Sequence, residues 1–457
     1  MRTVTVTEFQ FIERGQDGPF TDLTHNQLPP ACFDRLLELL TETVEETKED
    51  KVFRVRNRKQ PKGLCIQAMS QVGYIQISDD SAVEILPKID LSTVSNEGAR
   101  EEALRKLLIK MLATVYNLPI QENWANLGQA KGPLLDIFIQ IFLHEVELLC
   151  RRGLRADYLD VEQNEPFLKG RLLVKENIRQ NTLRLEQFYC RYQIFTEDRI
   201  ENRLILSALL KVAALSRDPN NSRKAVGLLS FFGQVSESRD YAQDLAKWQT
   251  DFAMRGYRNL KFWCKLLLNI SPQLSAGNLH MQSILFPMEQ LFEAYIQAKF
   301  KQQFQIEVSR NNTGRFYRIA NNHDGGQGGY RLARWCDDSS SRPEVFALRP
   351  DIVVFEDNKP SLILDAKWKV LDEEKYKLDI KESDVYQMLA YAYRLKPSSE
   401  NLCLVFPKTS KFSKLVRFNF LQDEDEHTKY TVNVIPYDLE RDVFIDISWR
   451  KLVVLFS

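Results

Sequence analysis

Residues 349–369 have the sequence RPDIVVFEDNKPSLILDAKWK, which predicts a β-hairpin. Apolar runs lie on either side of the turn-forming segment EDNKP, so two short strands should pair antiparallel. Asp365 and Lys367 are two positions apart, so on a strand their side chains point to the same side. The antiparallel return can place Asp351 beside them. We therefore expect two carboxylates and one ammonium to converge at one end of the hairpin.

Two converging aspartates and a lysine suit metal-dependent hydrolysis. Asp oxygens are hard ligands for Mg²⁺ or Mn²⁺, and Mg²⁺ is usually held by one or two carboxylates together with substrate phosphate. The ion can polarise a phosphoryl oxygen and lower the pKa of a bound water, while the Lys367 ammonium orients that water. Pro350-Asp351 followed by Asp365-Ala366-Lys367 is similar to the PD-(D/E)xK nuclease signature. Taken alone, the same residues also fit a solvated hairpin face.

Two flanking helices extend this pattern. Upstream, FPMEQLFEAYIQAKF predicts an amphipathic helix with Glu289 and Glu293 one turn apart. Downstream, DVYQMLAYAYRL places Gln387 and Tyr391 four residues apart. This order of parts resembles the RecB-like branch of the PD-(D/E)xK nucleases. The resemblance implies that Glu289 adds a carboxylate for the metal and that Gln387 and Tyr391 position the site or the DNA strand; each residue alone could also belong to an ordinary helix surface.

Composition limits the class of protein. The chain has 457 residues, 44% of them hydrophobic and 27% charged, which is enough for two or three domains. Its formal net charge is zero, so any DNA contact must come from local basic patches. The cysteines form no C-x-x-C pair, which indicates reduced thiols in a cytoplasmic protein and argues against a zinc site. The most apolar long segment, residues 132–150, contains acidic and polar residues and predicts an amphipathic helix, so we expect no membrane partner.

The fold class that we predict is a multidomain α+β and α/β protein. Residues 1–95 should form a small N-terminal α+β module that could contact DNA or a partner. Residues 96–280 predict a helical middle domain, from which a β-ribbon over residues 154–195 projects for partner docking; Thr196 is expected to cap the next helix. Residues 281–457 should form a PD-(D/E)xK restriction-endonuclease-like α/β domain around the hairpin.

Six motifs in a fixed order resemble the McrC family, the nuclease subunits of prokaryotic McrBC-type modification-dependent restriction systems. They are KGRLLVKENIRQN, TEDRIENRLILSALL, the Met288-Glu289 helix, RPDIVVF, LDAKWK and Gln387-xxx-Tyr391. The resemblance covers about residue 100 to the C-terminus. It implies an endonuclease that acts on modified, methylcytosine-type double-stranded DNA together with an AAA+ GTPase ring subunit of the McrB type.

The resemblance also implies that an extension of this chain inserts in the GTPase ring and stimulates hydrolysis. The chain has no Gly-Lys dipeptide and therefore no P-loop, so GTP should be bound by the partner and not by this chain. Lys169 and Arg171, on either side of Gly170 in the ribbon, are the candidates for the stimulating contact. A guanidinium suits bridging of carboxylates or phosphates at an interface, although Arg171 could equally be a plain surface residue.

The basic segment KTSKFSKLVRF contains four cations and no acid. These cations, Lys408, Lys411, Lys414 and Arg417, form our predicted DNA-backbone patch. Phosphate contacts position a duplex without reading its sequence, which suits a nuclease whose specificity lies in another subunit. Two other functions stay open. One is a stand-alone RecB-like repair exonuclease, which would cut DNA ends without a partner, and the other is a non-catalytic factor that only stimulates the GTPase.

Overall fold

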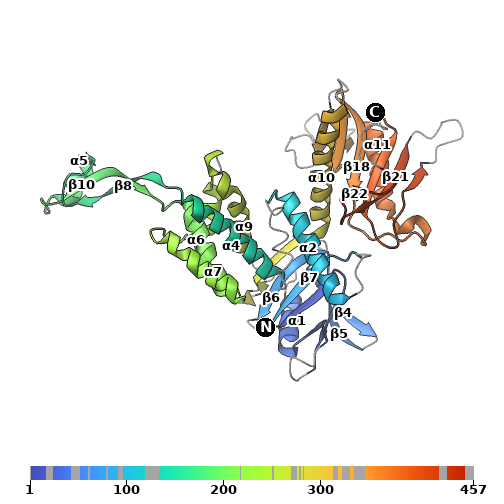
Figure 1. Ribbon diagram of the computed structural model, residues 1–457, viewed down its shortest axis with the longest axis horizontal. Helices are drawn as coiled ribbons and strands as arrows, with labels where there is room; N and C mark the ends of the chain where they lie inside the picture. Colours follow the sequence, from blue (N-terminus) through green and yellow to red (C-terminus); the bar gives the residue numbers. More distant parts are fainter. Residues whose placement is uncertain are drawn as a thin grey trace. The chain divides into compact units, whose positions relative to one another are not determined.

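The computed structural model forms two compact units that both contain helices and strands (Figure 1). The structure describes residues 2–16, 24–42, 52–59, 62–78, 81–90, 96–118, 133–216, 218–249, 252–268, 275–276, 279–280, 282–311, 317–321, 330–333, 345–420 and 430–447. The first unit consists of Met1–Gly73, Ser78–Trp124 and Leu285–Ser457, and the second of Tyr74–Ile77 and Ala125–Ile284. This mixed architecture confirms the predicted multidomain α/β class at that level.

Two four-stranded sheets are built mainly from strands of the N-terminal residues. One has the order β1 (Arg2–Thr7), β7 (Ser81–Leu86), β6 (Gln71–Ser78) and β13 (Gln282–Pro287). The other has the order β3 (Gln27–Leu28), β2 (Phe11–Arg14), β5 (Lys62–Ala68) and β4 (Phe53–Lys59), and α1 (Pro30–Glu42) contacts it. A turn at Glu8 and Phe9 separates β1 from β2, with Phe9 at a φ of 66°. The first sheet thus includes a strand from outside residues 1–95.

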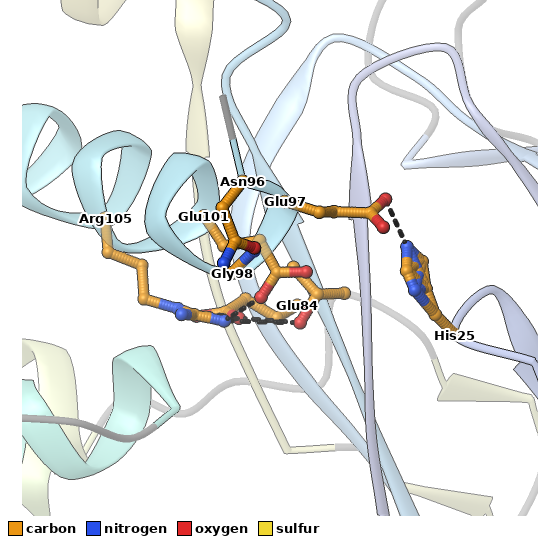
Figure 2. A network of polar contacts seen from close by, with 8 residues as sticks. His25, Glu84, Asn96, Glu97, Gly98, Glu101 and Arg105 are labelled. Carbon is orange, nitrogen blue, oxygen red and sulfur yellow. Dashed lines mark hydrogen bonds and ion pairs between the residues drawn. The ribbon is translucent and has the colours of Figure 1, made fainter. Parts of the chain in front are cut away.

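A buried ion pair joins helix α2 (Glu97–Val115) to this first sheet (Figure 2). The Arg105 guanidinium donates to both carboxylate oxygens of Glu84 on β7, at 2.9 and 2.6 Å, and Thr5 on β1 donates to the same carboxylate at 3.1 Å. Glu84 is fully buried, so these bonds compensate for the loss of its hydration. The structure therefore groups α2 with the N-terminal sheet, which differs from the predicted domain boundary at residue 95.

The C-terminal part of the first unit is built on a mixed sheet. Its strands, in spatial order, are β14 (Tyr317–Asn321), β17 (Ile352–Glu356), β18 (Lys359–Ala366), β19 (Asn401–Pro407), β21 (Thr431–Asp438) and β20 (Val416–Asn419), with β22 (Val443–Phe444) also paired to β21. The predicted hairpin is confirmed, because β17 and β18 pair antiparallel with Ile352 opposite Leu364. Asp357 and Asn358 form its turn at φ values of 47° and 65°, a conformation that Asp and Asn tolerate well.

Two helices flank this sheet. Helix α11 (Glu382–Leu395) packs Met388, Tyr391 and Ala392 into a core with side chains of β17, β18, β19 and β21. Helix α10 (Met288–Asn311) confirms the helix expected upstream of the hairpin, and it contacts β18 and β14. The site described below lies where β17, β18, α10 and α11 meet.

The second unit is helical with a long β-ribbon, as the sequence predicts. Its longest helices are α4 (Leu134–Arg152), α6 (Ile200–Leu215), α7 (Pro219–Leu229) and α9 (Arg258–Leu268). Strands β8 (Asp157–Glu165) and β10 (Phe188–Thr196) extend away from these helices, and β9 (Arg171–Leu172) and α5 (Val174–Asn181) lie near the far end (Figure 1). Across the described ranges, we find no helix that combines the length and apolar character needed to span a membrane.

Two local predictions for the ribbon are corrected. The segment between its strands contains the short helix α5, whereas a β-ribbon had been predicted over the whole of residues 154–195. Thr196 does not cap α6, because β10 continues through Thr196 and the helix begins at Ile200. The Thr196 hydroxyl instead accepts a hydrogen bond of 3.0 Å from the Asp198 backbone N–H, in the segment that joins the strand to the helix.

Candidate active site

The hairpin brings Asp351 and Asp365 together as expected. Asp351 directly precedes β17 and Asp365 is the next-to-last residue of β18, so the antiparallel register places them opposite each other. Asp351 Oδ2 accepts a hydrogen bond of 2.7 Å from the Ala366 backbone N–H, which fixes it against the end of β18. Both side chains are buried, with 4% of Asp351 and 1% of Asp365 exposed. Two carboxylates are therefore held side by side in a largely dehydrated place.

Lys367 provides a cation next to this pair. Its backbone N–H donates to Val405 O at 2.8 Å, so the segment stays alongside β19, and its Nζ lies 2.8 Å from Asp365 Oδ2. The Lys367 side chain keeps 24% of its surface exposed, so it is less buried than the two aspartates. Burial alone would lower the pKa of Lys367, but the charges of Asp365 and Asp351 outweigh it and raise that pKa. Lys367 therefore stays charged.

Helix α10 adds a third carboxylate, and it is that of Glu293. Burial raises the pKa of Glu293 to about 7; Lys367 opposes this shift, while Asp365 and Glu289 add to it. The pKa of Asp351 is also raised well above its ordinary value, first by burial and then by Asp365 and Glu293. Burial likewise raises the pKa of Asp365, although Lys367 opposes this shift. The structure thus brings Glu293 into the cluster. Glu293 lies one turn from Glu289, which had been predicted as the third carboxylate.

Glu289, the predicted third carboxylate, lies one turn earlier and is exposed. Its charge acts on Glu293 and also raises the pKa of Glu8 in the turn after β1. It therefore lies at the margin of the cluster. The spacing of four residues gave both glutamates one helix face, but only the packing of α10 on β18 decides which of them faces the aspartates.

Gln387 and Tyr391 approach from α11. Gln387 Nε2 donates to the Tyr391 hydroxyl at 2.6 Å, and this hydroxyl donates to Asp365 Oδ1 at 3.4 Å. Burial and the charges of Asp365 and Asp351 raise the pKa of Tyr391, so the phenol remains a protonated donor. Asp384, on the same helix, was not predicted to belong to the site, yet its charge raises the pKa of both Asp365 and Lys367.

The charges of this site suit a divalent cation. Three carboxylates, those of Asp351, Asp365 and Glu293, interact with the ammonium of Lys367, and their pKa values are raised first by burial and then by repulsion from neighbouring carboxylates. Within the described ranges, no three His, Cys, Asp or Glu side chains are arranged to hold a metal ion by themselves. Asp351 and Asp365 could hold Mg²⁺ or Mn²⁺ together with water and substrate oxygens, which is how proteins commonly bind Mg²⁺.

The predicted DNA patch is only partly available. Lys408 forms an ion pair of 2.9 Å with Asp438, and Lys411 one of 3.3 Å with Asp372. Arg417 is exposed on β20, where its Nε donates to Asn433 at 3.0 Å, and Lys414 is exposed in the preceding loop. Two of the four cations therefore already have acidic partners.

The ribbon residues lie in the second unit. Lys169 Nζ lies 3.9 Å from the ring centre of Tyr192, and Gly170 adopts a φ of 67°. Arg171 on β9 pairs in register with Arg191 on β10, and its side chain is exposed. Arg191 is bound by Glu162, whereas Arg171 has no ion-pair partner in the part of the chain that the structure describes.

Comparisons with known proteins support the resemblance to the McrC family. The model of a family described as "McrBC 5-methylcytosine restriction system component" matches residues 66–407, a range that includes the hairpin, α10 and α11. The Escherichia coli (strain K12) protein "Type IV methyl-directed restriction enzyme EcoKMcrBC" is 26% identical over 326 residues, which are 65% of this chain and 84% of that protein.

A solved structure gives the same result for the fold. It is described as a half-complex from a tetradecameric assembly of Thermococcus gammatolerans McrB AAA+ hexamers with bound McrC. It superposes with a TM-score of 0.64 over 99% of both chains at 16% identity, so it shows a shared fold. Since the family match spans most of the sequence and contains the whole Asp351, Asp365 and Lys367 cluster, this chain belongs to the McrBC 5-methylcytosine restriction system component family.

Proposed function

We propose that this chain is the metal-dependent endonuclease subunit of a modification-dependent restriction complex. The observation that carries the proposal is the placement of buried Asp351 and Asp365 beside Lys367 at the end of the hairpin. Two carboxylates and an ammonium at a strand end fit the PD-(D/E)xK arrangement of its RecB-like branch. The substrate would be double-stranded DNA that carries a modified, methylcytosine-type base.

Each residue of the cluster has a role in this proposal. Asp351 and Asp365 hold Mg²⁺ or Mn²⁺, and Glu293 adds negative charge or a water-mediated contact at the side of α10, with Glu289 at its margin. The bound ion would polarise the phosphoryl oxygen and acidify a water. Lys367 orients that water. The hydrogen bonds from Gln387 to the Tyr391 hydroxyl and from that hydroxyl to Asp365 keep Asp365 in place.

We also propose that the chain works with an AAA+ GTPase ring of the McrB type, which binds the GTP. The similar Thermococcus gammatolerans assembly consists of McrB AAA+ hexamers with bound McrC. The far end of the ribbon exposes large apolar side chains: Phe167, Leu168, Val174, Ile178, Leu183 and Leu185. Exposed apolar patches mark interaction sites, so this end is a suitable docking surface, with Lys169 and Arg171 as the stimulating cations. Exposed Lys414 and Arg417 are the better candidates for backbone contacts to DNA.

The test is cleavage of a methylated plasmid by this chain with an McrB-type partner, GTP and Mg²⁺. Asp351→Asn removes one negative charge from the cluster but keeps an oxygen that can accept the Ala366 N–H. Asp357→Asn makes the same change on the exposed turn of the same hairpin and serves as the control. The proposal expects Asp351→Asn to abolish cleavage and Asp357→Asn to leave it unchanged; equal cleavage by both variants would refute it.

The same assay separates the rival functions. Shortening of linear DNA from its ends in the absence of the partner would favour a repair exonuclease. If this chain accelerates GTP hydrolysis by the partner but the complex does not cut DNA, the result would favour an assembly factor.

A further inference from the structure

Trp368 links the end of the hairpin to the N-terminal sheet. It follows Lys367 in the chain, and only 4% of it is exposed. Its indole N–H donates to Glu8 Oε2 at 2.8 Å, across 360 residues of sequence. Its ring packs on Phe292 at a centroid distance of 5.2 Å, and Phe292 directly precedes Glu293 on α10. One side chain thus touches the N-terminal sheet and the helix that carries the third carboxylate.

Glu8 is a buried carboxylate with a defined set of donors. It lies in the turn after β1 and is 3% exposed. Its backbone N–H donates to Leu86 O at 3.0 Å, and its Oε2 also accepts from the Lys88 backbone N–H at 3.1 Å. Burial of a carboxylate is unfavourable unless hydrogen bonds or cations compensate for it. At this buried position the glutamate therefore supplies one acceptor for both the Lys88 N–H and the Trp368 indole.

The chain after β18 needs such an anchor. The ladder bond from Lys367 N to Val405 O is the last one that this segment makes to β19, and Lys369 N then turns back to Lys367 O at 3.0 Å. Beyond that bond, the direction of the Lys367 side chain depends on where its neighbour Trp368 is held. Because Trp368 directly follows Lys367, a fixed indole restricts the backbone that carries the Lys367 side chain.

We infer that Glu8 is a positioning residue of the active site, which acts through Trp368 on Lys367 and on the turn of α10 that carries Glu293. This inference rests on the proposed function and deepens it. It makes the N-terminal sheet a working part of the nuclease site, whereas residues 1–95 had been expected to form a separate module.

The same sheet offers a matched control. Glu84 on β7 is also buried, but its carboxylate accepts hydrogen bonds from Arg105 (Figure 2) and from Thr5, and not from an indole. Glu84→Gln therefore weakens the N-terminal sheet and leaves the hydrogen bond between Glu8 and Trp368 in place. If cleavage falls in both the Glu8 and the Glu84 variants, the cause is general destabilisation. If it falls in the Glu8 variants alone, the cause is the loss of positioning.

The first measurement does not depend on cleavage. In the full chain without metal, lysine acylation by acetic anhydride is followed at Lys367 by peptide mass spectrometry. If the indole leaves its place, the ammonium loses its ion pair with Asp365, so Glu8→Leu and Trp368→Phe should raise the rate of Lys367 acylation by roughly threefold or more. Glu84→Gln should leave it at the wild-type value. Unchanged acylation in Glu8→Leu would overturn the inference.

The second measurement is DNA cleavage by the full complex with Mg²⁺ and GTP. Glu8→Leu should lower kcat roughly tenfold to a hundredfold, as displacement of a catalytic group does, with little change in KM. Glu8→Gln keeps an oxygen that accepts the indole N–H and should restore most of the rate. The inference would be refuted if Glu8→Leu kept the wild-type kcat, or if Glu84→Gln lowered kcat as much as Glu8→Leu does. Failure of the proposed function would look different from failure of this inference. In that case Asp351→Asn would still cut DNA, while the effect of Glu8→Leu on Lys367 acylation would remain.

Discussion

Lys367 Nζ lies 2.8 Å from Asp365 Oδ2, and the two residues are separated by one position at the end of β18. The ammonium forms an ion pair with this carboxylate. A divalent ion bound by Asp351 and Asp365 would compete for the same oxygen. With such an ion held by these two residues, the Lys367 ammonium would lie where it could orient a water or interact with a phosphate.

The first prediction concerns this ammonium. Lys367→Ala should lower cleavage by roughly a hundred- to a thousandfold, the usual effect of losing one electrostatic stabiliser, with little change in DNA affinity. Lys369→Ala is the control, because Lys369 instead binds the backbone oxygen of Asp379. The measurements are the cleavage rate and the DNA affinity of both variants. Equal losses of binding and cutting in Lys367→Ala would identify it as a DNA-backbone contact.

The second prediction concerns the metal. The proposed ligands are all carboxylate oxygens, so Mg²⁺ or Mn²⁺ should support cleavage and Zn²⁺, which prefers His and Cys ligands, should substitute poorly. The measurement is the cleavage rate against each ion after treatment with chelator. Sustained cleavage in excess chelator would exclude the proposed chemistry.

The third prediction follows from Glu293, whose pKa is raised from 4.5 to about 7. Between these two values the folded, metal-free protein binds more protons than the unfolded chain, so this group stabilises the fold at low pH and the contribution is lost as pH rises towards 7. Glu293→Gln removes this dependence and should therefore be more stable, relative to wild type, at pH 7.5 than at pH 5.5.

Urea unfolding in chelator at the two pH values measures the effect. Addition of Mg²⁺ should reduce the difference between the variants, since the ion offsets the same excess of negative charge. A difference in unfolding free energy that does not vary with pH would show that Glu293 does not titrate in this window.

Local patterns predicted the hairpin, because alternation and an Asp-Asn turn act over a few residues. They also placed Asp351, Asp365 and Lys367 together and put Gln387 and Tyr391 on one helix face. The choice of Glu293 over Glu289 could not be made, since it depends on how α10 packs against β18. Glu8 lies 360 residues before Trp368, and no spacing rule connects them. Sequence patterns therefore located the motif but could not predict the side chains that tertiary packing brings to it, Glu293 and Glu8.

The fourth prediction concerns Gly170 in the ribbon. A Cβ at this position would lie 2.5 Å from Arg191 O and 2.7 Å from Tyr192 Cβ, in addition to the strain of a φ of 67°. Gly170→Ala should therefore loosen β9 from β10 by more than about 1 kcal/mol and weaken GTPase stimulation. Gly153→Ala is the control, since Gly153 also has a positive φ but no atom within 4 Å of the added Cβ.

Hydrogen exchange of the ribbon amides and stimulation of GTP hydrolysis by the partner measure the effect of Gly170→Ala. If both variants lose protection and stimulation to the same extent, backbone strain explains the result and close packing at Gly170 does not.

The last prediction separates the two activities assigned to one chain. The carboxylate cluster belongs to the first unit and the ribbon around Lys169 and Arg171 to the second, so substitutions in the two should act nearly independently. Asp365→Ala should abolish DNA cleavage yet leave stimulation of GTP hydrolysis almost intact. Arg171→Ala should weaken stimulation, and cleavage should fall only as far as it depends on GTP hydrolysis.

The experiment is one GTPase assay and one cleavage assay on each variant, with assembly checked by size. Arg179→Ala is a matched control for Arg171→Ala, because it removes an exposed arginine from α5 of the same ribbon. Loss of both activities in Asp365→Ala, in a complex that still assembles, would contradict the separation, because a carboxylate buried beneath Lys367 would then be required for a contact made by the ribbon. An equal loss of stimulation in Arg171→Ala and Arg179→Ala would instead show that the ribbon acts through its overall positive charge.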